Sequence, residues 1–388
     1  MQLDFHYYAT YSAAILAGYS HEESMTICYS DQFTDLCSRS YLESIGAPGA
    51  AATTQLQLEM MDLNLNTVGL QEVTRIWSSF HFLPYDLYAE LPKRPKRYMH
   101  KYRLICNTNG QLLVDTVQLA KGSSLEAAGI AMHVLADTWA HRYFAGTPSY
   151  VINNTNYHFF ELVPDGEAFC ERRIEFNHNP LTRDDLSAGS YTNSLSQTKE
   201  KTIMNLGHGR AGHLPDYSFA RYKYLPAWAD FSEITKDNPA DYLHAFSQMV
   251  YAMRYLRAEN GAFETNCYAD EVIAPYLDEI RSILEKRQLH AEAEWKAFGE
   301  KLSGREIEPF DRDRYKEQYL AADRKQKEDT VLGRYLLAAM RHKSMVTHKI
   351  YSSGNPLAGV SVDYAKDGFQ GIRDFRLLLK KKGRETDE

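Results

Sequence analysis

The sequence predicts an all-α fold, a multi-helical bundle with long loops and room for one small hairpin. Apolar residues recur at the spacing of helix faces along most of the chain, and capping signals stand where these patterns begin. Strand signals are few. The segment LICNTNGQLLV, residues 104 to 114, places Asn-Gly between two apolar runs and is the one expected hairpin.

The first expected helices lie near the N-terminus. Ser20 followed by Glu23 has the spacing of a capping box, which predicts a helix that reaches about Asp35. Gly18 is expected to end the helix before it, because glycine readily adopts the left-handed conformation that follows many helices.

Two central helices are predicted in the same way. Ser123 and Glu126 predict a second capping box, whose helix would run to about Ala145 with Gly146 as its stop. Asn238-Pro239 predicts the start of a third helix, because proline is favoured in the first helical turn.

The remaining segments set the expected domain organisation. Residues 270 to 302 and 312 to 345 are predicted to be long, charged amphipathic helices. Residues 147 to 215 are rich in Asn, Gly, Pro and Ser and are expected to form long surface loops, which are often functional. We expect a catalytic helical domain over 1–260 and a helical extension packed on it over 261–388, with one continuous domain as the alternative.

Composition is that of an ordinary globular protein. The chain has 388 residues, 44% hydrophobic and 24% charged, enough for a sizeable core. Its formal net charge of -7 argues against a nucleic-acid partner, and the short basic cluster at residues 93 to 97 is interpreted as a solvated loop. Five cysteines without a CxxC motif argue against a disulfide scaffold and a cysteine-based zinc site.

Targeting signals are not recognisable. The N-terminal residues lack the basic start of a standard signal peptide, and no apolar run approaches the roughly 20 residues of a membrane span. Cytoplasmic location is therefore the default expectation, with non-classical secretion as the alternative. The oligomeric state is left open.

One helix carries a candidate metal-binding face. His133, Asp137 and His141 are each four residues apart, which places them on the same side of a helix. The two histidines are about 12 Å apart along the axis, too far for one ion whose bonds are about 2.0–2.2 Å long. Since a carboxylate has two oxygens, Asp137 between them suggests a shared ligand of at least two ions. Satisfied polar groups on a packed helix are the alternative.

Other segments add nitrogen and oxygen donors. The candidate metal ligands are His6, Asp35, His81, His133, Asp137, His141, His213 and Asp216. Such a set suits two or three Zn²⁺ ions without any cysteine. Asp31 is a rival for Asp35 and His208 for His213, while Asp4 and His158 are further candidates.

In this order, the motifs resemble the zinc-dependent phospholipase C superfamily, with the bacterial zinc metallophospholipases C as the most similar branch. This group includes the catalytic domain of glycosylphosphatidylinositol-specific phospholipase D and the single-strand-specific zinc nucleases. The similar motifs are Phe5-His6, Phe33-Thr34-Asp35, Phe80-His81-Phe82, the stretch from His133 to His141, and His213-Leu-Pro-Asp216. The resemblance covers roughly residues 1 to 225 and implies a phospholipase C-like helical bundle around a metal cleft.

The chain departs from that family at three points. In the bacterial branch the mature N-terminal residue is itself a metal ligand, whereas this chain begins Met-Gln-Leu-Asp without a recognisable cleavage site, so Asp4 is considered in its place. In the bacterial branch the central aspartate and the next histidine are six positions apart rather than four. Its last carboxylate is a glutamate, where this chain has Asp216.

The resemblance implies a zinc-dependent hydrolase in lipid degradation, a phospholipase C that cleaves glycerophospholipids at a membrane or micelle surface to diacylglycerol and a phosphorylated head group by metal-activated water. Asp35 and Asp137 are the expected catalytic residues, and Asp35 would bridge the ions or orient the nucleophile. Arg142 and Arg210 are candidates for phosphate contact, with surface salt bridges as the alternative. The other functions considered are a phosphodiesterase or nuclease on another diester and a non-catalytic, metal-stabilised helical binding protein.

Overall fold

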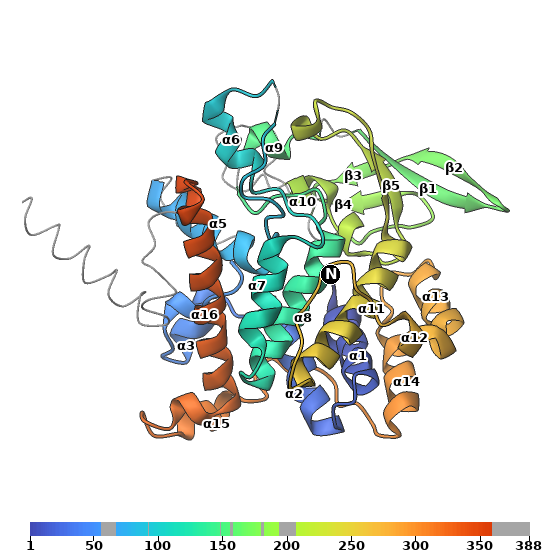
Figure 1. The fold of residues 1–388 in the computed structure, drawn as a ribbon. Coiled ribbons are helices and arrows are strands. Elements are labelled where there is room, and N and C mark those ends of the chain that lie inside the picture. Colours follow the sequence, from blue (N-terminus) through green and yellow to red (C-terminus); the bar gives the residue numbers. More distant parts are fainter. Residues whose placement is uncertain are drawn as a thin grey trace, which may run out of the picture.

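Helix α8, Leu125–Ala140, lies at the centre of the helical part of the molecule (Figure 1). The computed structural model describes residues 1–55, 67–91, 93–147, 149–155, 158–179, 182–193 and 207–358. Beyond its first turn α8 is buried on every side, as expected of a helix enclosed by others. The helices packed against it are α2 (His21–Phe33), α5 (Thr67–Phe80), α7 (Gln111–Ala120), α11 (Asn238–Arg257) and α16 (Val331–Ser352).

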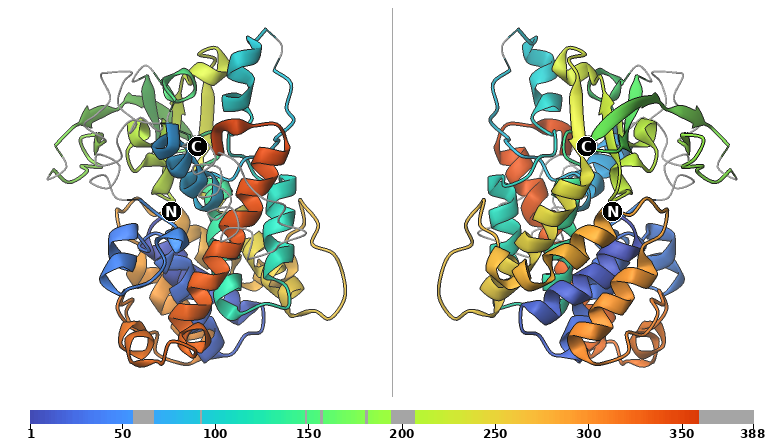
Figure 2. Two further views of the ribbon diagram at one scale, coloured as in Figure 1. Left: turned by 90° about the vertical axis from the view of Figure 1, so that its left-hand side faces the viewer. Right: turned by 90° about the vertical axis from the view of Figure 1, so that its right-hand side faces the viewer.

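The N-terminal chain enters this bundle through a π-helical turn. This turn, η1 (Asp4–Ala9), continues directly into α1 (Thr10–Leu16). The views in Figure 2 place the N-terminus between the helical part and a lobe of strands and loops. The other helical elements here are α3 (Arg39–Ser44), η2 (Gly49–Ala51), α12 (Asp270–Ile273), η5 (Ala274–Tyr276), α13 (Leu277–Glu285), α14 (Glu292–Ser303), α15 (Lys316–Ala321), η6 (Lys327–Asp329) and η7 (Pro356–Ala358).

Two sheets form the second part of the molecule. The antiparallel sheet has the order β2-β1-β5-β6, with β1 (Phe159–Asp165), β2 (Ala168–Arg173), β5 (Arg221–Tyr224) and β6 (Ile234–Asp237). Strands β3 (Glu175–Asn177) and β4 (Ser190–Thr192) pair in parallel. The short helices of this part are α6 (Lys96–Tyr102), α9 (Tyr150–Asn153), α10 (Gly207–Ala211), η3 (Leu214–Asp216) and η4 (Ala227–Ala229).

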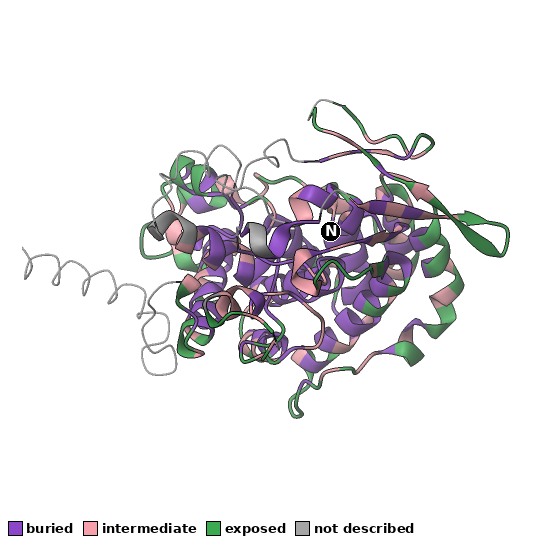
Figure 3. Cartoon of the chain, turned by 90° about the horizontal axis from the view of Figure 1, so that it is seen from above, coloured by how far each residue is buried: buried purple, intermediate pink, exposed green. Residues whose placement is uncertain are grey.

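The all-α prediction is therefore wrong, because the fold is mixed α and β. Part of the segment expected to be long surface loops, residues 147 to 215, forms β1 to β4, while residues 194 to 206 lie outside the described structure. The signal missed in the sequence is the alternation in β5, whose Tyr222 and Tyr224 are buried while Arg221 and Lys223 are partly exposed. Strand β2 is mostly exposed, as Figure 3 shows at the end of the β1–β2 hairpin, so it carries little apolar pattern.

The hairpin expected at residues 104 to 114 does not form, although all of these residues are described. Asn109 has a left-handed φ of 61° and Gly110 precedes α7, so Asn-Gly starts a helix here. A Cβ atom on Gly110 would lie 2.6 Å from the carbonyl oxygen of Tyr85, which explains why glycine follows Asn109.

The helix predictions differ in quality. The Ser20–Glu23 capping box is confirmed at the start of α2, and Gly18, at φ 91°, follows α1 as expected. The start at Asn238 is confirmed in α11. In α8 the capping residue is Ser124 rather than Ser123, and the helix ends at Ala140 rather than near Ala145.

The two long C-terminal helices are predicted wrongly. Residues 270 to 302 are divided into α12, η5, α13 and α14, with Pro275 in the 3-10 turn between the first two α-helices. Residues 312 to 345 contain α15, η6 and the start of α16. In the described part of the chain no helix is long and apolar enough to cross a membrane.

A glycine sets the distance between α2 and α8. A Cβ atom on Gly129 would lie 2.4 Å from the carbonyl oxygen of Ile27 and 2.6 Å from Cβ of Ser30. The absence of a side chain at Gly129 therefore allows the two helices to approach closely. This contact lies one turn before His133 and places it beside Asp31 of α2.

Candidate metal centre

A buried cluster of histidines and aspartates lies where α8 meets the N-terminal turn, α2 and the loops beside the sheet. His6 comes from η1, a π-helical turn of the kind that occurs often at functional sites. Asp31 and Asp35 come from the end of α2, and His81 directly follows α5. The other members are His133 and Asp137 on α8, His141 just after it, His208 on α10 and Asp216 on η3.

Asp137 lies at the centre of this cluster and is 1% exposed. Its Oδ1 lies 3.2 Å from Nε2 of His6. Its Oδ2 lies 3.2 Å from both Nε2 of His133 and Nδ1 of His81. Ligands of one tetrahedral zinc ion with bonds of 2.0–2.2 Å are roughly 3.3–3.6 Å apart. The spacings around Asp137 are therefore close to those of metal ligands.

A first donor group contains Asp35, His81 and His133. Oδ1 of Asp35 lies 3.7 Å from Nδ1 of His81 and 3.8 Å from Nε2 of His133. Nε2 of His81 is 3.0 Å from the carbonyl oxygen of Thr53, to which it can donate a proton, and this leaves Nδ1 with a free lone pair. Asp35 is the most exposed member of the group, at 27%, so this group faces solvent through Asp35.

A second donor group contains His141, His208 and Asp216. Oδ1 of Asp216 lies 3.2 Å from Nε2 of His141 and 3.3 Å from Nε2 of His208. Nδ1 of His141 lies 2.7 Å from the carbonyl oxygen of His81, so this ring can donate there while Nε2 keeps its lone pair for an ion.

The amino group of Met1 lies between the two parts of the cluster. Its nitrogen is 3.0 Å from Oδ1 of Asp137 and 3.1 Å from Oδ1 of Asp216, and it is fully buried. Burial lowers the pKa of this amine, but the carboxylates of Asp137 and Asp216 outweigh that effect and raise it to about 11. The amine thus supplies positive charge at a point where two carboxylates converge.

The cluster perturbs the pKa of its own histidines and carboxylates. Burial lowers the pKa of His133, but Asp137 and Asp35 outweigh burial and raise it to about 10. Burial lowers the pKa of His141 to about 4 despite Asp137, so this ring is neutral near pH 7. Burial alone would raise the pKa of Asp216, yet the Met1 ammonium and His208 hold it well below its usual range. At His133 a proton thus occupies a donor atom that a metal ion would take over.

The donor set fits divalent ions. Nε2 of the buried His6 lies 3.2 Å from Oδ1 of Asp137 but makes no aligned hydrogen bond within the described residues. A buried imidazole without such a partner is costly unless a cation engages it. The donors are imidazole nitrogens and carboxylate oxygens, a combination that suits zinc.

The sequence-predicted residues divide into two sets. The structure brings together His6, Asp35, His81, His133, Asp137, His141 and Asp216, with the rivals Asp31 and His208. His213 lies outside the cluster: its side chain is 54% exposed and its Nδ1 lies 3.5 Å from Asp184. His208, eight residues before Asp216, occupies the position that His213 was expected to fill.

The other candidates lie outside the donor groups among the described residues. One carboxyl oxygen of Asp4 accepts from the backbone N–H of Phe5 at 2.7 Å, and His158 lies against the ring of Phe160. Arg142 pairs with Asp241 at 3.3 Å, which favours a structural use of its guanidinium. Arg210 is buried and its carbonyl oxygen accepts from Asn193. The sequence left open whether Asp4 or the N-terminus completes a third site, and in the structure it is the amino group of Met1 that lies beside Asp137 and Asp216.

Comparison with known proteins gives one match. The model of a family described as "Family of unknown function (DUF6765)" matches residues 1–350. No curated protein and no solved structure matches the chain.

Proposed function

This chain belongs to the DUF6765 family of unknown function, and we propose that it is a zinc-dependent phosphodiester hydrolase of the phospholipase C type. The observation that carries the proposal is the position of Asp137. Its two oxygens face different histidines, His6 on one side and both His81 and His133 on the other. A carboxylate so placed suits two ions held close together, an arrangement common in enzymes that act on phosphate esters.

Three sets of donor atoms are available. The first comprises Asp35, His81, His133 and Oδ2 of Asp137, and the second comprises His141, His208 and Asp216. His6 and Oδ1 of Asp137, with the nearby Met1 nitrogen, form the third. The first two sets offer donors for two ions. The third set, which shares Asp137 with the first, brings the number to three. When bound, zinc ions would supply Lewis-acid chemistry that polarises a phosphoryl oxygen and makes water more acidic.

Asp35 is the residue best placed to act on a nucleophile. It is the partly exposed carboxylate of the first donor set, whereas Asp137 is buried. A carboxylate at the solvent side of the cluster can accept a hydrogen bond from water and orient its oxygen toward a diester. Asp137 and His133 are held in position by the packing of α8, which keeps this part of the site preorganised.

The proposed reaction is hydrolysis of one ester bond. The water oxygen forms a bond to phosphorus, and the bond from phosphorus to the glycerol oxygen breaks. One water proton goes to the leaving glycerol oxygen and the other to a carboxylate such as Asp35. The products are diacylglycerol and a phosphorylated head group.

Exposed aromatic residues support a lipid substrate. Tyr85 and Tyr88, shortly after His81, are 47% and 67% exposed, and Phe231 is 40% exposed. The segments carrying them are joined by Arg94, which pairs with Asp230 at 2.6 Å and donates to the carbonyl of Trp228. Tyrosine combines an apolar body with a polar tip, which suits the surface of a membrane. The net charge of -7 is less suited to a nucleic-acid substrate.

A substrate panel tests the proposal. Zinc-loaded protein is assayed on phosphatidylcholine micelles, single-stranded DNA and a soluble chromogenic diester, with released head-group phosphate, nucleotides and chromophore as readouts. We expect diacylglycerol and phosphocholine to form, and we expect an Asp137→Asn variant to lose this activity.

The controls separate the alternatives. Hydrolysis of DNA and of no other substrate would contradict the phospholipase C proposal and favour a nuclease. Bound zinc without hydrolysis of any diester would contradict catalysis and favour a metal-stabilised binding protein. The variants Tyr88→Ser and Phe231→Ser should reduce activity on micelles while activity on the soluble diester is kept, because both side chains are exposed and neither belongs to the donor sets.

A further inference from the structure

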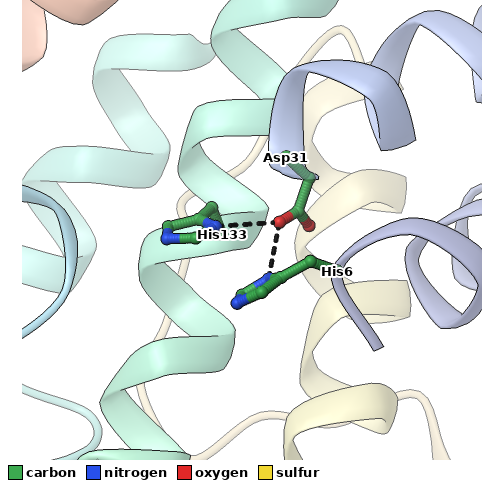
Figure 4. A group of neighbouring side chains, drawn as sticks. All are labelled: His6, Asp31 and His133. Carbon is green, nitrogen blue, oxygen red and sulfur yellow. Dashed lines mark hydrogen bonds and ion pairs between the residues drawn. The ribbon is translucent and has the colours of Figure 1, made fainter. Parts of the chain in front are cut away.

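Asp31 contacts two histidines, and these two histidines face different oxygens of Asp137. In Figure 4 its carboxylate lies beside both His6 and His133. Oδ1 of Asp31 is 3.1 Å from Nδ1 of His133, in a hydrogen bond, and 2.7 Å from Nδ1 of His6, at an ion-pair distance. All three side chains are fully buried.

The geometry argues against an ion held between these three residues. The rings of His6 and His133 are stacked, with centroids 4.0 Å apart and planes inclined by 23°. An imidazole binds a metal in the plane of its ring, and one ion cannot lie in the planes of two stacked rings. The 2.7 Å contact of Asp31 with His6 is also shorter than the spacing of roughly 3.3–3.6 Å between ligands of one tetrahedral zinc ion.

The other oxygen of Asp31 is already engaged. Thr10 donates its hydroxyl hydrogen to Oδ2 at 2.6 Å. Close packing fixes the same position, because Gly129 allows α2 to lie directly against α8 one turn from His133. Asp31 is therefore held by two neighbouring elements and has no oxygen left over for a ligand.

From these contacts we propose that Asp31 is a positioning residue rather than a metal ligand, and that it orders two histidines that serve different ions. The inference rests on the proposed metal centre. A proton on Nδ1 of His133, shared with Asp31, leaves Nε2 as the donor that faces Oδ2 of Asp137. The negative charge of Asp31 beside Nδ1 of His6 favours the proton there too, so that Nε2 faces Oδ1 of Asp137. One buried carboxylate thus links the affinities of two ion sites.

Asp31→Asn is the most informative change. Asparagine keeps the shape and an acceptor oxygen but removes the charge. We expect the zinc content of a saturated sample to stay the same while the affinity of two sites falls together by about 10- to 100-fold, as for other carboxylates behind histidine ligands. The Co²⁺ absorption spectrum of saturated protein should be unchanged, because no ligand is lost.

Matched variants isolate the cause. Asp35→Asn changes a proposed ligand two residues after the end of α2 and should alter the Co²⁺ spectrum. Thr10→Val removes the hydrogen bond to Asp31 while nearly keeping volume, and it should weaken both sites by a smaller factor. A loss of one ion with an altered Co²⁺ spectrum in Asp31→Asn would overturn the proposal, since Asp31 would then be a ligand. Unchanged affinity at both sites would also overturn it.

The readout does not depend on catalysis. Nitrogen NMR of zinc-loaded protein should show both His6 and His133 protonated on Nδ1, and Asp31→Asn should weaken the hydrogen bonds that these protons make. Protonation on Nε2 in the wild-type protein would contradict the role of Asp31. If the wild-type protein binds zinc with these tautomers but hydrolyses no diester, the proposed function fails and the role of Asp31 stands.

Discussion

The imidazole rings of His6 and His133 stack face to face, with their centroids 4.0 Å apart. The two Nε2 atoms face different oxygens of Asp137. One ion cannot lie in both ring planes, so the two rings suit different ions. This relationship makes Asp137 the residue on which the proposed centre depends.

The first prediction concerns Asp137 itself. Asp137→Asn removes the charge shared by two donor sets, so we expect at least one ion to be lost and kcat to fall by at least about 100-fold. Elemental analysis and steady-state kinetics provide the measurement. Asp4→Asn is the matched control, since Asp4 is a buried aspartate of the same region that lies outside the donor groups. Equal zinc content in both variants would contradict the assignment.

The second prediction separates two histidines close together in the sequence. His208 lies 3.3 Å from Asp216, whereas His213 is mostly exposed and lies beside Asp184. We expect His208→Gln to lose an ion and most activity, while His213→Gln keeps both within about twofold. Zinc titration of the two variants provides the measurement, and the opposite order of effects would refute the placement of α10.

The third prediction concerns metal removal. A ligand that binds only the folded chain stabilises it, by about 2.7 kcal/mol at a concentration 100 times its Kd. Chelation should therefore lower the thermal unfolding midpoint, and added zinc should restore it. Asp137→Asn should show a smaller shift on chelation. A wild-type midpoint that is the same with and without chelator would show that no ion stabilises the fold.

The fourth prediction concerns stability against acid, away from the metal centre. Glu161 of β1 is 1% exposed and accepts hydrogen bonds from Arg172, Arg287 and Tyr191. Burial alone would raise its pKa, but Arg287 and Arg172 outweigh burial and hold the pKa below the ordinary value of 4.5. Its stabilising effect is therefore complete above pH 4.5 and is lost as the pH falls through the lower pKa of the folded state.

A substitution measures this contribution. Glu161→Gln should lower the free energy of unfolding by about 3 kcal/mol at pH 7, because two arginines lose their buried partner. The difference from wild type, followed by urea unfolding, should shrink below pH 4. Glu171→Gln is the control, since its pair with Lys223 is exposed and should change stability by less than about 1 kcal/mol. A difference that grows in acid would contradict the assigned role.

Local signals in the sequence predicted the parts of the structure that depend on neighbours in the chain. The capping box of α2 and the start of α11 were correct because each is set within one helical turn. The sheet was missed because β2 is exposed and because β1 pairs on its other edge with β5, a strand distant in the sequence. Pairing across about 60 residues leaves little trace in a local pattern.

In the candidate site too, the residues predicted correctly are those set by local spacing, and those missed depend on distant parts of the chain. Helical spacing alone placed His133 and Asp137 on one face, and the structure brings them to the centre of the cluster. The choice between His208 and His213 depends on how α10 and η3 turn, which the intervening glycines leave open in the sequence. The role of Gly129 could not be predicted either, because it depends on the approach of α2.

The most direct test of the account is an anomalous diffraction map of zinc-loaded crystals, collected at the zinc edge. We predict at least two peaks on opposite sides of the Asp137 carboxylate, one near His6 and one near His81 and His133, with none at Asp31. A map without peaks in this cluster, or with a single peak between His6, Asp31 and His133, would contradict the account.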